Sequence, residues 1–285
     1  MNELHLDLAG IRISVTAEEF GNLDFLEEYL TEPAEPTHRF RAMLVDRPEP
    51  PDGSLVCDQP GLRVYRDGER MISYRGPVAS GLENAYLRTE RREEDGVLEF
   101  IRARTPGGIS GRQLLPALEL PHLLTIHGGF LLHASYIAHE GRAILFTAPS
   151  ETGKSTQAQL WCDHAGAKLV NGDRAAVRIM DGTVYACGTP YSGSSPVRQN
   201  VKLPLAAIVY LSQAPENGIT RLRGARAFRR VWEGCTVNTW DRSDVDLATG
   251  TVSDVIGRVP VYHLACTPDS RAVELLKHSM EVEIC

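Results

Sequence analysis

A lysine–serine pair at positions 154 and 155 is the strongest candidate for chemistry in this chain. It closes the stretch Ala148-Pro-Ser-Glu-Thr-Gly-Lys-Ser155, which follows the apolar run 143–146. A short strand, a loop of small residues and then Lys-Ser opening a helix are typical of a phosphate-binding P-loop. Backbone N–H groups and the helix N-terminus hold phosphates in such a loop. Lys154 is therefore predicted to contact the terminal phosphates, and the Ser155 hydroxyl to bind Mg²⁺.

The residues around this pair form the predicted nucleotide-binding set. They are Ser150, Glu151, Thr152, Gly153, Lys154, Ser155 and Thr156. One position departs from the usual pattern, because Ala148 stands where a first glycine is common. Alanine fits there if its φ is negative, so we interpret the stretch as a variant loop. The alternative is a Gly-Lys-Ser turn at a helix start that binds nothing.

Asp173 and His133 are the predicted catalytic groups beside Lys154. Asp173 ends a short strand after the loop's helix. A carboxylate there can hold Mg²⁺, or accept the proton of an attacking hydroxyl. The alternative is an aspartate that only shapes an Asn-Gly-Asp turn.

His133 lies on the strand that precedes the loop strand. The runs 131–138 and 142–147 flank Glu140-Gly141, which predicts a hairpin with residues 139 and 142 opposite one another. This register places His133 opposite Ala148, beside the phosphates. A lone histidine on an apolar strand is also common as a core residue, so that alternative stays open.

An arginine is expected to neutralise charge during phosphoryl transfer. The candidates are Arg174, Arg198 and the helical group Arg226, Arg229 and Arg230. Arg198 is the first choice, because it lies in the Ser-, Gly- and Pro-rich loop 188–200, which can close over the site.

The composition limits the classes of function. The chain has 285 residues, 42% of them hydrophobic and 24% charged, with a formal net charge of -7. It has no long basic run, which argues against a nucleic acid partner. No window of about 18 apolar residues exists, so no membrane partner is expected. Six scattered cysteines without a Cys-x-x-Cys pair, and an N-terminus unlike a secretory signal, predict a cytoplasmic chain with free thiols.

The chain is predicted to contain two domains. Residues 1–108 are expected to be β-rich, with a short helix over 20–30, and to pack on the second half or present a substrate to it. Predicted hairpins pair 4–8 with 11–15, 62–65 with 71–74, and 86–89 with 97–102. The glycine-rich segment 106–111 marks the boundary, and 109–285 form the P-loop domain. This domain begins with a helix over 114–127, which Pro121 either kinks or starts. Because a hairpin feeds the loop strand, we predict an α/β fold with a mixed sheet.

Four segments together resemble the HPr kinase/phosphorylase-type P-loop family, which is related to phosphoenolpyruvate carboxykinase. They are 131–135, 148–155, 169–174 and 188–193. The resemblance implies a mixed sheet around the P-loop and ATP- and Mg²⁺-dependent phosphorylation of a serine hydroxyl. It matches the family's functional positions to His133, Lys154, Ser155 and Asp173. Relatives of HPr kinase are often oligomers, so a homo-oligomer is expected.

The sequence departs from this family at three places. The family's Asp-Asp pair is Gly172-Asp173 here, and residues 188–195 replace the segment that carries a Glu and an Arg-Gly signature in true HPr kinases. Residues 1–108 do not look like the HPr kinase regulatory domain. The chain looks more like the short relatives found beside peptide-modification systems, some of which phosphorylate a serine in a lasso precursor.

The sequence therefore predicts an ATP/Mg²⁺-dependent kinase acting on a serine-type hydroxyl of a peptide or small molecule. The alternative is a non-catalytic nucleotide-binding module, regulatory or scaffolding, in a peptide-maturation system. Gly172 and Ala148 motivate that alternative. Decarboxylation of the phosphoenolpyruvate carboxykinase kind ranks last, because no second His, Lys and Asp cluster is present. The choice between ATP and GTP stays open.

Overall fold

The computed structural model describes residues 1–193 and 195–282, and it divides into two compact units, Met1–Leu120 and Pro121–Cys285. The sequence predicts the boundary between 108 and 109, so residues 109–120 belong to the first unit instead. Contacts with residues near 20 hold them there: the Gly111 backbone N–H donates to the Asn22 carbonyl oxygen at 2.9 Å, and Ile109 pairs with Phe20. The glycine-rich composition of residues 106–111 suggested a boundary there, but composition does not predict these contacts.

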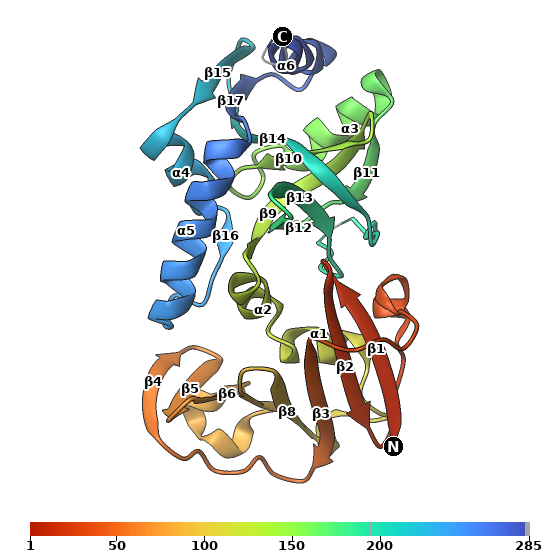
Figure 1. The fold of residues 1–285 in the computed structure, drawn as a ribbon, viewed down its shortest axis with the longest axis vertical. Coiled ribbons are helices and arrows are strands. Elements are labelled where there is room, and N and C mark those ends of the chain that lie inside the picture. Colours follow the sequence, from red (N-terminus) through yellow and green to blue (C-terminus); the bar gives the residue numbers. More distant parts are fainter. Residues whose placement is uncertain (194, 283–285) are drawn as a thin grey trace. The chain divides into compact units, whose positions relative to one another are not determined.

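The first unit is an eight-stranded sheet in the order β1-β2-β3-β8-β7-β6-β5-β4 (Figure 1). β3 pairs in parallel with β2 and β8, and the other neighbours are antiparallel. The three predicted hairpins are confirmed as β1–β2, β5–β6 and β7–β8. The strands are β1 (Asn2–Leu8), β2 (Ile11–Ala17), β3 (His38–Val45), β4 (Ser54–Gln59), β5 (Leu62–Asp67), β6 (Arg70–Arg75), β7 (Leu87–Arg91) and β8 (Asp95–Ile101).

Short helical segments complete the first unit. The helix predicted over 20–30 is a 3₁₀ helix, η1. The helix predicted over 114–127 is divided in two, because Glu119 has a left-handed backbone with φ 49°. The segments are η1 (Asp24–Tyr29), η2 (Val78–Ser80), η3 (Leu82–Asn84), η4 (Arg102–Arg104), α1 (Gly111–Ala117) and, running on into the second unit, α2 (Leu120–Ile126).

The second unit is built on a mixed sheet with the strand path β10-β9-β12-β13-β14-β17-β15. β10 also pairs with β14, which closes β9, β10, β14, β13 and β12 into a ring, and β11 and β16 pair with β9. The β10–β14 and β14–β17 pairs are parallel. The strands are β9 (Gly129–His139), β10 (Arg142–Thr147), β11 (Lys168–Asn171), β12 (Arg174–Met180), β13 (Thr183–Gly188), β14 (Lys202–Gln213), β15 (Gly218–Leu222), β16 (Cys235–Thr236) and β17 (Val261–Cys266).

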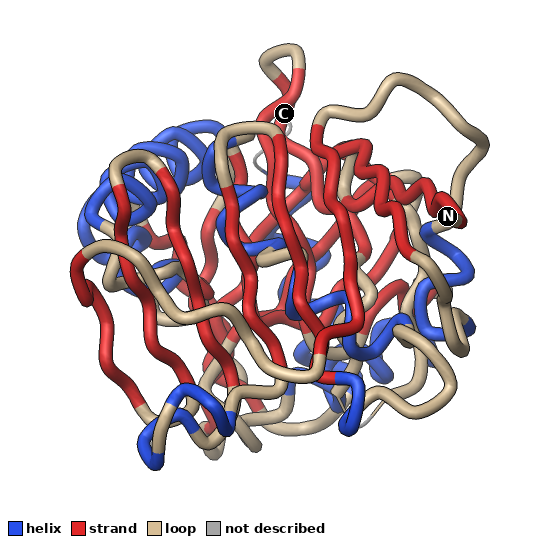
Figure 2. Tube along the Cα trace, turned by 90° about the horizontal axis from the view of Figure 1, so that it is seen from below, coloured by secondary structure: helices blue, strands red, loops and turns tan. Residues whose placement is uncertain are grey.

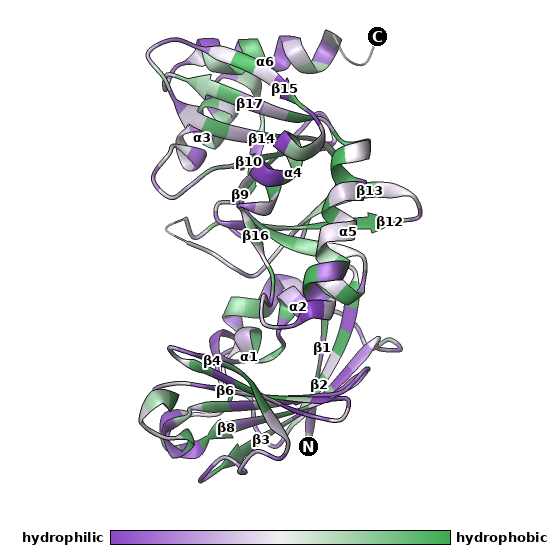
Figure 3. Ribbon diagram, turned by 90° about the vertical axis from the view of Figure 1, so that its left-hand side faces the viewer, coloured by the Kyte–Doolittle hydropathy of each residue, from purple (hydrophilic) through white to green (hydrophobic). Residues whose placement is uncertain are grey.

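Helices form a core on each face of this sheet, which makes the fold mixed α/β. The helices are α3 (Lys154–Ala165), α4 (Gly224–Trp232), α5 (Arg242–Arg258) and α6 (Ser270–Val282). Figure 2 shows strands in red and helices in blue, and Figure 3 shows the hydrophobic colouring along β14 and β17.

Successive side chains of β10 enter opposite cores. Ala143 and Leu145 pack in the core that includes residues of α4 and α5, whereas Ile144 and Phe146 pack in the core that includes residues of α3 and α6. Side chains alternate along a strand, so a strand covered on both faces is apolar throughout. The continuous apolar run before the loop follows from this burial on both faces of the sheet.

None of the helices in residues 1–193 and 195–282 is both long and apolar enough to span a lipid bilayer. Every cysteine in this part of the chain is a free thiol, at positions 57, 162, 187, 235 and 266.

Candidate active site

The loop between β10 and α3 has the strand–loop–helix form that the sequence predicts. β10 ends at Thr147 and α3 begins at Lys154. The chain turns through two left-handed residues, Glu151 with φ 63° and Gly153 with φ 111°. Glycine adopts this backbone without the strain that a side chain brings. Ala148 has no positive φ, so the condition under which alanine fits its position is met.

The Lys154 amine lies inside this loop. Its side chain is 8% exposed, and Nζ donates to the carbonyl oxygens of Ala148 at 3.1 Å and Pro149 at 3.2 Å. Burial lowers the pKa of Lys154, and the charge of Asp173 acts in the opposite direction. Phosphate oxygens carry more charge than peptide carbonyls, so a phosphate in the loop would be the stronger acceptor.

The hairpin register predicted for His133 is confirmed. Arg142 pairs with His139, and the ladder continues to Thr147 opposite Ala134. The Thr147 hydroxyl donates to the His133 carbonyl at 3.0 Å, which ties the end of β10 to β9. His133 is therefore one residue beyond the last pair of the ladder, next to the start of the loop.

His133 and Asp173 meet because β9 and β12 are neighbours. Arg174 pairs with His133 across these strands, and His133 Nε2 lies 3.6 Å from Asp173 Oδ1. Burial lowers the pKa of His133, as do the charges of Lys154 and Arg174, while Asp173 opposes them. Because its pKa lies below the ordinary value of 6.5, the imidazole is neutral at pH 7.

Asn171 shapes the turn that presents Asp173. Its Oδ1 accepts from the backbone N–H groups of Asp173 at 2.8 Å and Arg174 at 2.9 Å. Its Nδ2 donates to the carbonyls of Thr189 and Tyr191, both at 2.9 Å. Asn171 is fully buried and joins the turn to the loop 188–200. The sequence reasoning missed this role, although the Asn-Gly-Asp turn chemistry was a signal for it.

The loop after β13 fills the space beside Gly172. A Cβ at Gly172 would lie 2.7 Å from Ser195 Cβ, and a Cβ at Gly193 would lie 3.1 Å from Asp173 Oδ1. Ser195 therefore occupies room that a carboxylate at position 172 would need, which gives a physical reason for the glycine.

Arg174 is the guanidinium that lies beside the carboxylate. Its Nε is 3.3 Å from Asp173 Oδ2, and Nη1 donates to the Thr236 hydroxyl at 2.8 Å. Arg198 pairs through its backbone with Asn171, and its Nη1 donates to the Pro196 carbonyl at 3.3 Å. These contacts do not carry Arg198 to Asp173, and its catalytic role stays a prediction.

The other predicted residues lie along the loop and the first turn of α3. Ser150, Glu151, Ser155 and Thr156 are exposed, and the Thr152 hydroxyl donates to the Ser150 carbonyl at 3.4 Å. In the described ranges, no three His, Cys, Asp or Glu side chains gather to hold a metal. Mg²⁺ commonly takes one or two protein oxygens together with phosphate and water, so Ser155 and Asp173 suit it as ligands.

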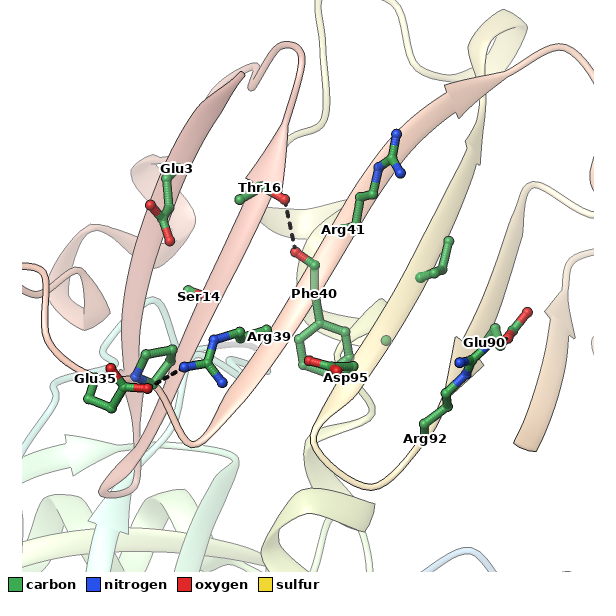
Figure 4. Close-up of a pocket in the computed structure, with 13 residues that line it drawn as sticks. Glu3, Ser14, Thr16, Glu35, Arg39, Phe40, Arg41, Glu90, Arg92 and Asp95 are labelled. Carbon is green, nitrogen blue, oxygen red and sulfur yellow. Dashed lines mark hydrogen bonds and ion pairs between the residues drawn. The ribbon is translucent and has the colours of Figure 1, made fainter. Parts of the chain in front are cut away.

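A separate hollow lies on the sheet of the first unit, with a volume of about 560 Å³. Figure 4 shows charges of both signs around it, with Arg39 paired to Glu35 and the Thr16 hydroxyl directed at the Phe40 carbonyl. None of the predicted site residues lines it.

The chain matches no protein-family model and no curated protein sequence. Among solved structures, it is similar to the Hpr(Ser) kinase/phosphatase from Coxiella burnetii, with a TM-score of 0.32 and 11% sequence identity. The match covers 54% of this chain and 98% of that chain. At this TM-score the likeness carries no argument, so function rests on the geometry of Lys154, His133 and Asp173.

Proposed function

We propose that the chain is an ATP- and Mg²⁺-dependent kinase that phosphorylates a serine-type hydroxyl on a peptide or small molecule in the cytoplasm. One observation carries the proposal. The loop that holds Lys154 adjoins a His133–Asp173 pair, so groups suited to phosphate binding and to proton transfer lie at one edge of the sheet.

The loop and Lys154 would bind the phosphates. The first N–H groups of α3 have no partner within the helix, and with Lys154 they attract negative charge. Mg²⁺ held by Ser155 and Asp173 would neutralise charge on the terminal phosphates.

Asp173 would take the proton of the attacking hydroxyl. The hydroxyl oxygen forms the new bond to the γ-phosphorus, the bond from phosphorus to the β–γ bridging oxygen breaks, and ADP leaves. The neutral His133 lies beside Asp173 and can take up that proton in turn. Arg174 holds the carboxylate from its other side and adds positive charge.

Transfer of radiolabelled γ-phosphate from ATP to an array of serine peptides tests this activity. Asp173→Asn keeps the size of the side chain and removes its basicity, so transfer should fall by roughly 10²- to 10⁴-fold. Matched peptides with alanine in place of serine should stay unlabelled. Equal labelling by the wild-type protein and Asp173→Asn would contradict the assignment.

A second function is favoured by one observation, the packing of Ser195 against Gly172, which leaves a single carboxylate in the turn. A non-catalytic module would bind MgATP as a signal or within a scaffold. Calorimetry that detects MgATP binding, with no ADP formed beside any peptide of the array, would favour that module.

A further inference from the structure

We propose that a cavity beside the carboxyl ends of β14 and β17 is a nucleobase site, and that Gln157 selects adenine there. The inference rests on the proposed function, because it requires a nucleotide in the loop 148–155. It goes further by assigning the base and the residues that read it.

The cavity begins at the loop and has a volume of about 480 Å³. Gly153 and Thr156 line it from the loop and the first turn of α3. Leu160 extends the same face one turn further along α3, because residues four apart are neighbours on a helix. The volume lies in the range of small-molecule sites.

The cavity is separate from the catalytic pair. His133 and Asp173 adjoin Lys154, and neither lines the cavity. A nucleotide has its reactive phosphate at one end and its base at the other. Phosphates in the loop, with the reactive phosphate near Asp173, therefore direct the nucleoside past Thr156 and into the cavity.

The walls suit a flat, apolar ring. Leu160 contributes from α3, Leu211 from the end of β14, and Pro268 from the turn that follows β17. Hydrogen bonds hold the β17 side, because Asn217 Oδ1 accepts from the Thr267 backbone N–H at 2.9 Å and from its hydroxyl at 3.2 Å. The wall is thus formed before any ligand enters.

Gln157 supplies the polar group that can choose between bases. Its side chain is 2% exposed and lines the cavity, and its Nε2 donates to Cys266 Sγ at 3.4 Å. Its Oε1 is buried and has no hydrogen-bond partner among residues 1–193 and 195–282. Adenine carries an amino donor at C6, whereas guanine carries an acceptor oxygen there. For a base bound with its C6 position facing Gln157, this acceptor favours the amino group of adenine over the carbonyl oxygen of guanine.

Cys266 reports on occupancy of the cavity, because its thiol lines the wall beside Gln157. In the full-length protein, alkylation by iodoacetamide would be followed by peptide mass spectrometry without ligand, with ADP and with tripolyphosphate. ADP should slow labelling of Cys266 by at least tenfold, and tripolyphosphate should not. Cys162 lies on α3 but does not line the cavity, so its labelling rate serves as the internal control.

Calorimetry on the same samples distinguishes a failure of the nucleobase assignment from a failure of the proposed kinase function. If ADP binds and Cys266 is labelled at the unliganded rate, or if tripolyphosphate protects it equally, the nucleobase assignment is overturned and the proposed kinase is not. If neither ADP nor tripolyphosphate binds, the proposed function fails and the assignment fails with it.

A variant tests the role of Gln157. Gln157→Leu should lower the affinity for ADP at least tenfold and leave the affinity for tripolyphosphate unchanged. The wild-type protein should bind ADP at least tenfold more tightly than GDP. Gln159→Leu is the matched control, because Gln159 is exposed on the same helix. Equal weakening of ADP and tripolyphosphate, or equal affinity for ADP and GDP, would overturn the adenine assignment. The labelling experiment decides occupancy even if Gln157→Leu does not fold.

Discussion

The neutral His133 has a consequence for the pH dependence of the proposed reaction. Burial and the charges of Lys154 and Arg174 hold the pKa of His133 below its ordinary value of 6.5, against the pull of Asp173. The neutral form therefore persists to a lower pH than in a free imidazole. Once His133 is protonated, it pairs with Asp173 and makes that carboxylate a weaker base.

ADP formation should accordingly stay constant as the pH falls to 6.5 and decline only at lower pH. The measurement is the pH profile of kcat/KM between about pH 5 and pH 8, because that ratio reports groups of the free enzyme. His133→Gln serves as the control and should lack this decline. An acidic midpoint at or above pH 6.5 in the wild-type protein would contradict a neutral His133.

The same shift affects stability. As the pH falls, the unfolded chain protonates this histidine near pH 6.5, whereas the folded chain protonates it only at lower pH. The free energy of unfolding therefore decreases as the pH falls from 6.5 through the lower pKa of the folded state. The contribution is fully present above pH 6.5. Burial also lowers the pKa of His127 and His263, so these residues act in the same direction.

At the scale of elements, the turn after β11 and the loop after β13 fit together at Gly172. A Cβ there would lie 2.7 Å from Ser195 Cβ, which is closer than real side chains approach. Gly172→Ala should therefore lower the free energy of unfolding by about 1–2 kcal/mol through overpacking. Ser195→Gly removes the opposing atoms, so Gly172→Ala should cost much less in that background.

A double-mutant cycle by urea denaturation measures this coupling. The cost of Gly172→Ala should be larger in the wild-type background than in Ser195→Gly. Equal costs in both backgrounds would mean that Ser195 does not occupy the space beside position 172.

Patterns within short stretches of the sequence predicted the hairpins, because a hairpin depends on residues that are close together in the chain. Alternating runs joined by short turns gave three hairpins in the first unit, and the Glu140-Gly141 turn gave the register that places His133. β4 was missed, since its sequence does not alternate and its residues Leu55 and Val56 are exposed at a sheet edge. Pro121 was expected to kink the helix over 114–127 or to set its start, and the break lies just before it, at Glu119, so that α2 begins at Leu120.

The residues of the candidate site likewise fall into two groups, those that local patterns predicted and those that they did not. Lys154 and Asp173 follow from motif and turn, and His133 from hairpin register. Arg174 was one of the arginine candidates in the sequence, and its contact with the Asp173 carboxylate distinguishes it from the others. The contact between Gln157 and Cys266 joins residues far apart in the chain, and no periodicity in the sequence predicts it.

At the scale of the whole molecule, the chain consists of two compact units. The predicted phosphate loop belongs to the second unit, and the first unit contains a buried carboxylate, Glu119, which accepts from Ser73 at 2.9 Å and pairs with Arg75 and Arg91 at 3.3 Å and 3.0 Å. Glu119 is 6% exposed, so these ionic contacts are shielded from water.

Glu119→Ala should destabilise the protein without abolishing nucleotide binding. It leaves two cations without this carboxylate, and because Arg75 is partly exposed we expect a loss of about 2–3 kcal/mol. Thermal unfolding should show a lower Tm, while added MgATP should still raise it. Glu93→Ala is the control, since Glu93 is exposed and its removal should change stability by less than about 0.5 kcal/mol. An unchanged Tm for Glu119→Ala would contradict the importance of this cluster.

The central claim is that Lys154 and its loop hold the phosphates of ATP, and calorimetric titration of MgATP into wild-type protein and Lys154→Ala tests it most directly. One charge-assisted contact is worth about 1.5–3 kcal/mol, so the variant should bind MgATP at least tenfold more weakly. Lys168→Ala removes an exposed lysine at the start of β11 and should bind as the wild type does. Circular dichroism would establish that both variants are folded. Equal affinity of wild-type protein and Lys154→Ala, or no binding by either, would contradict the claim.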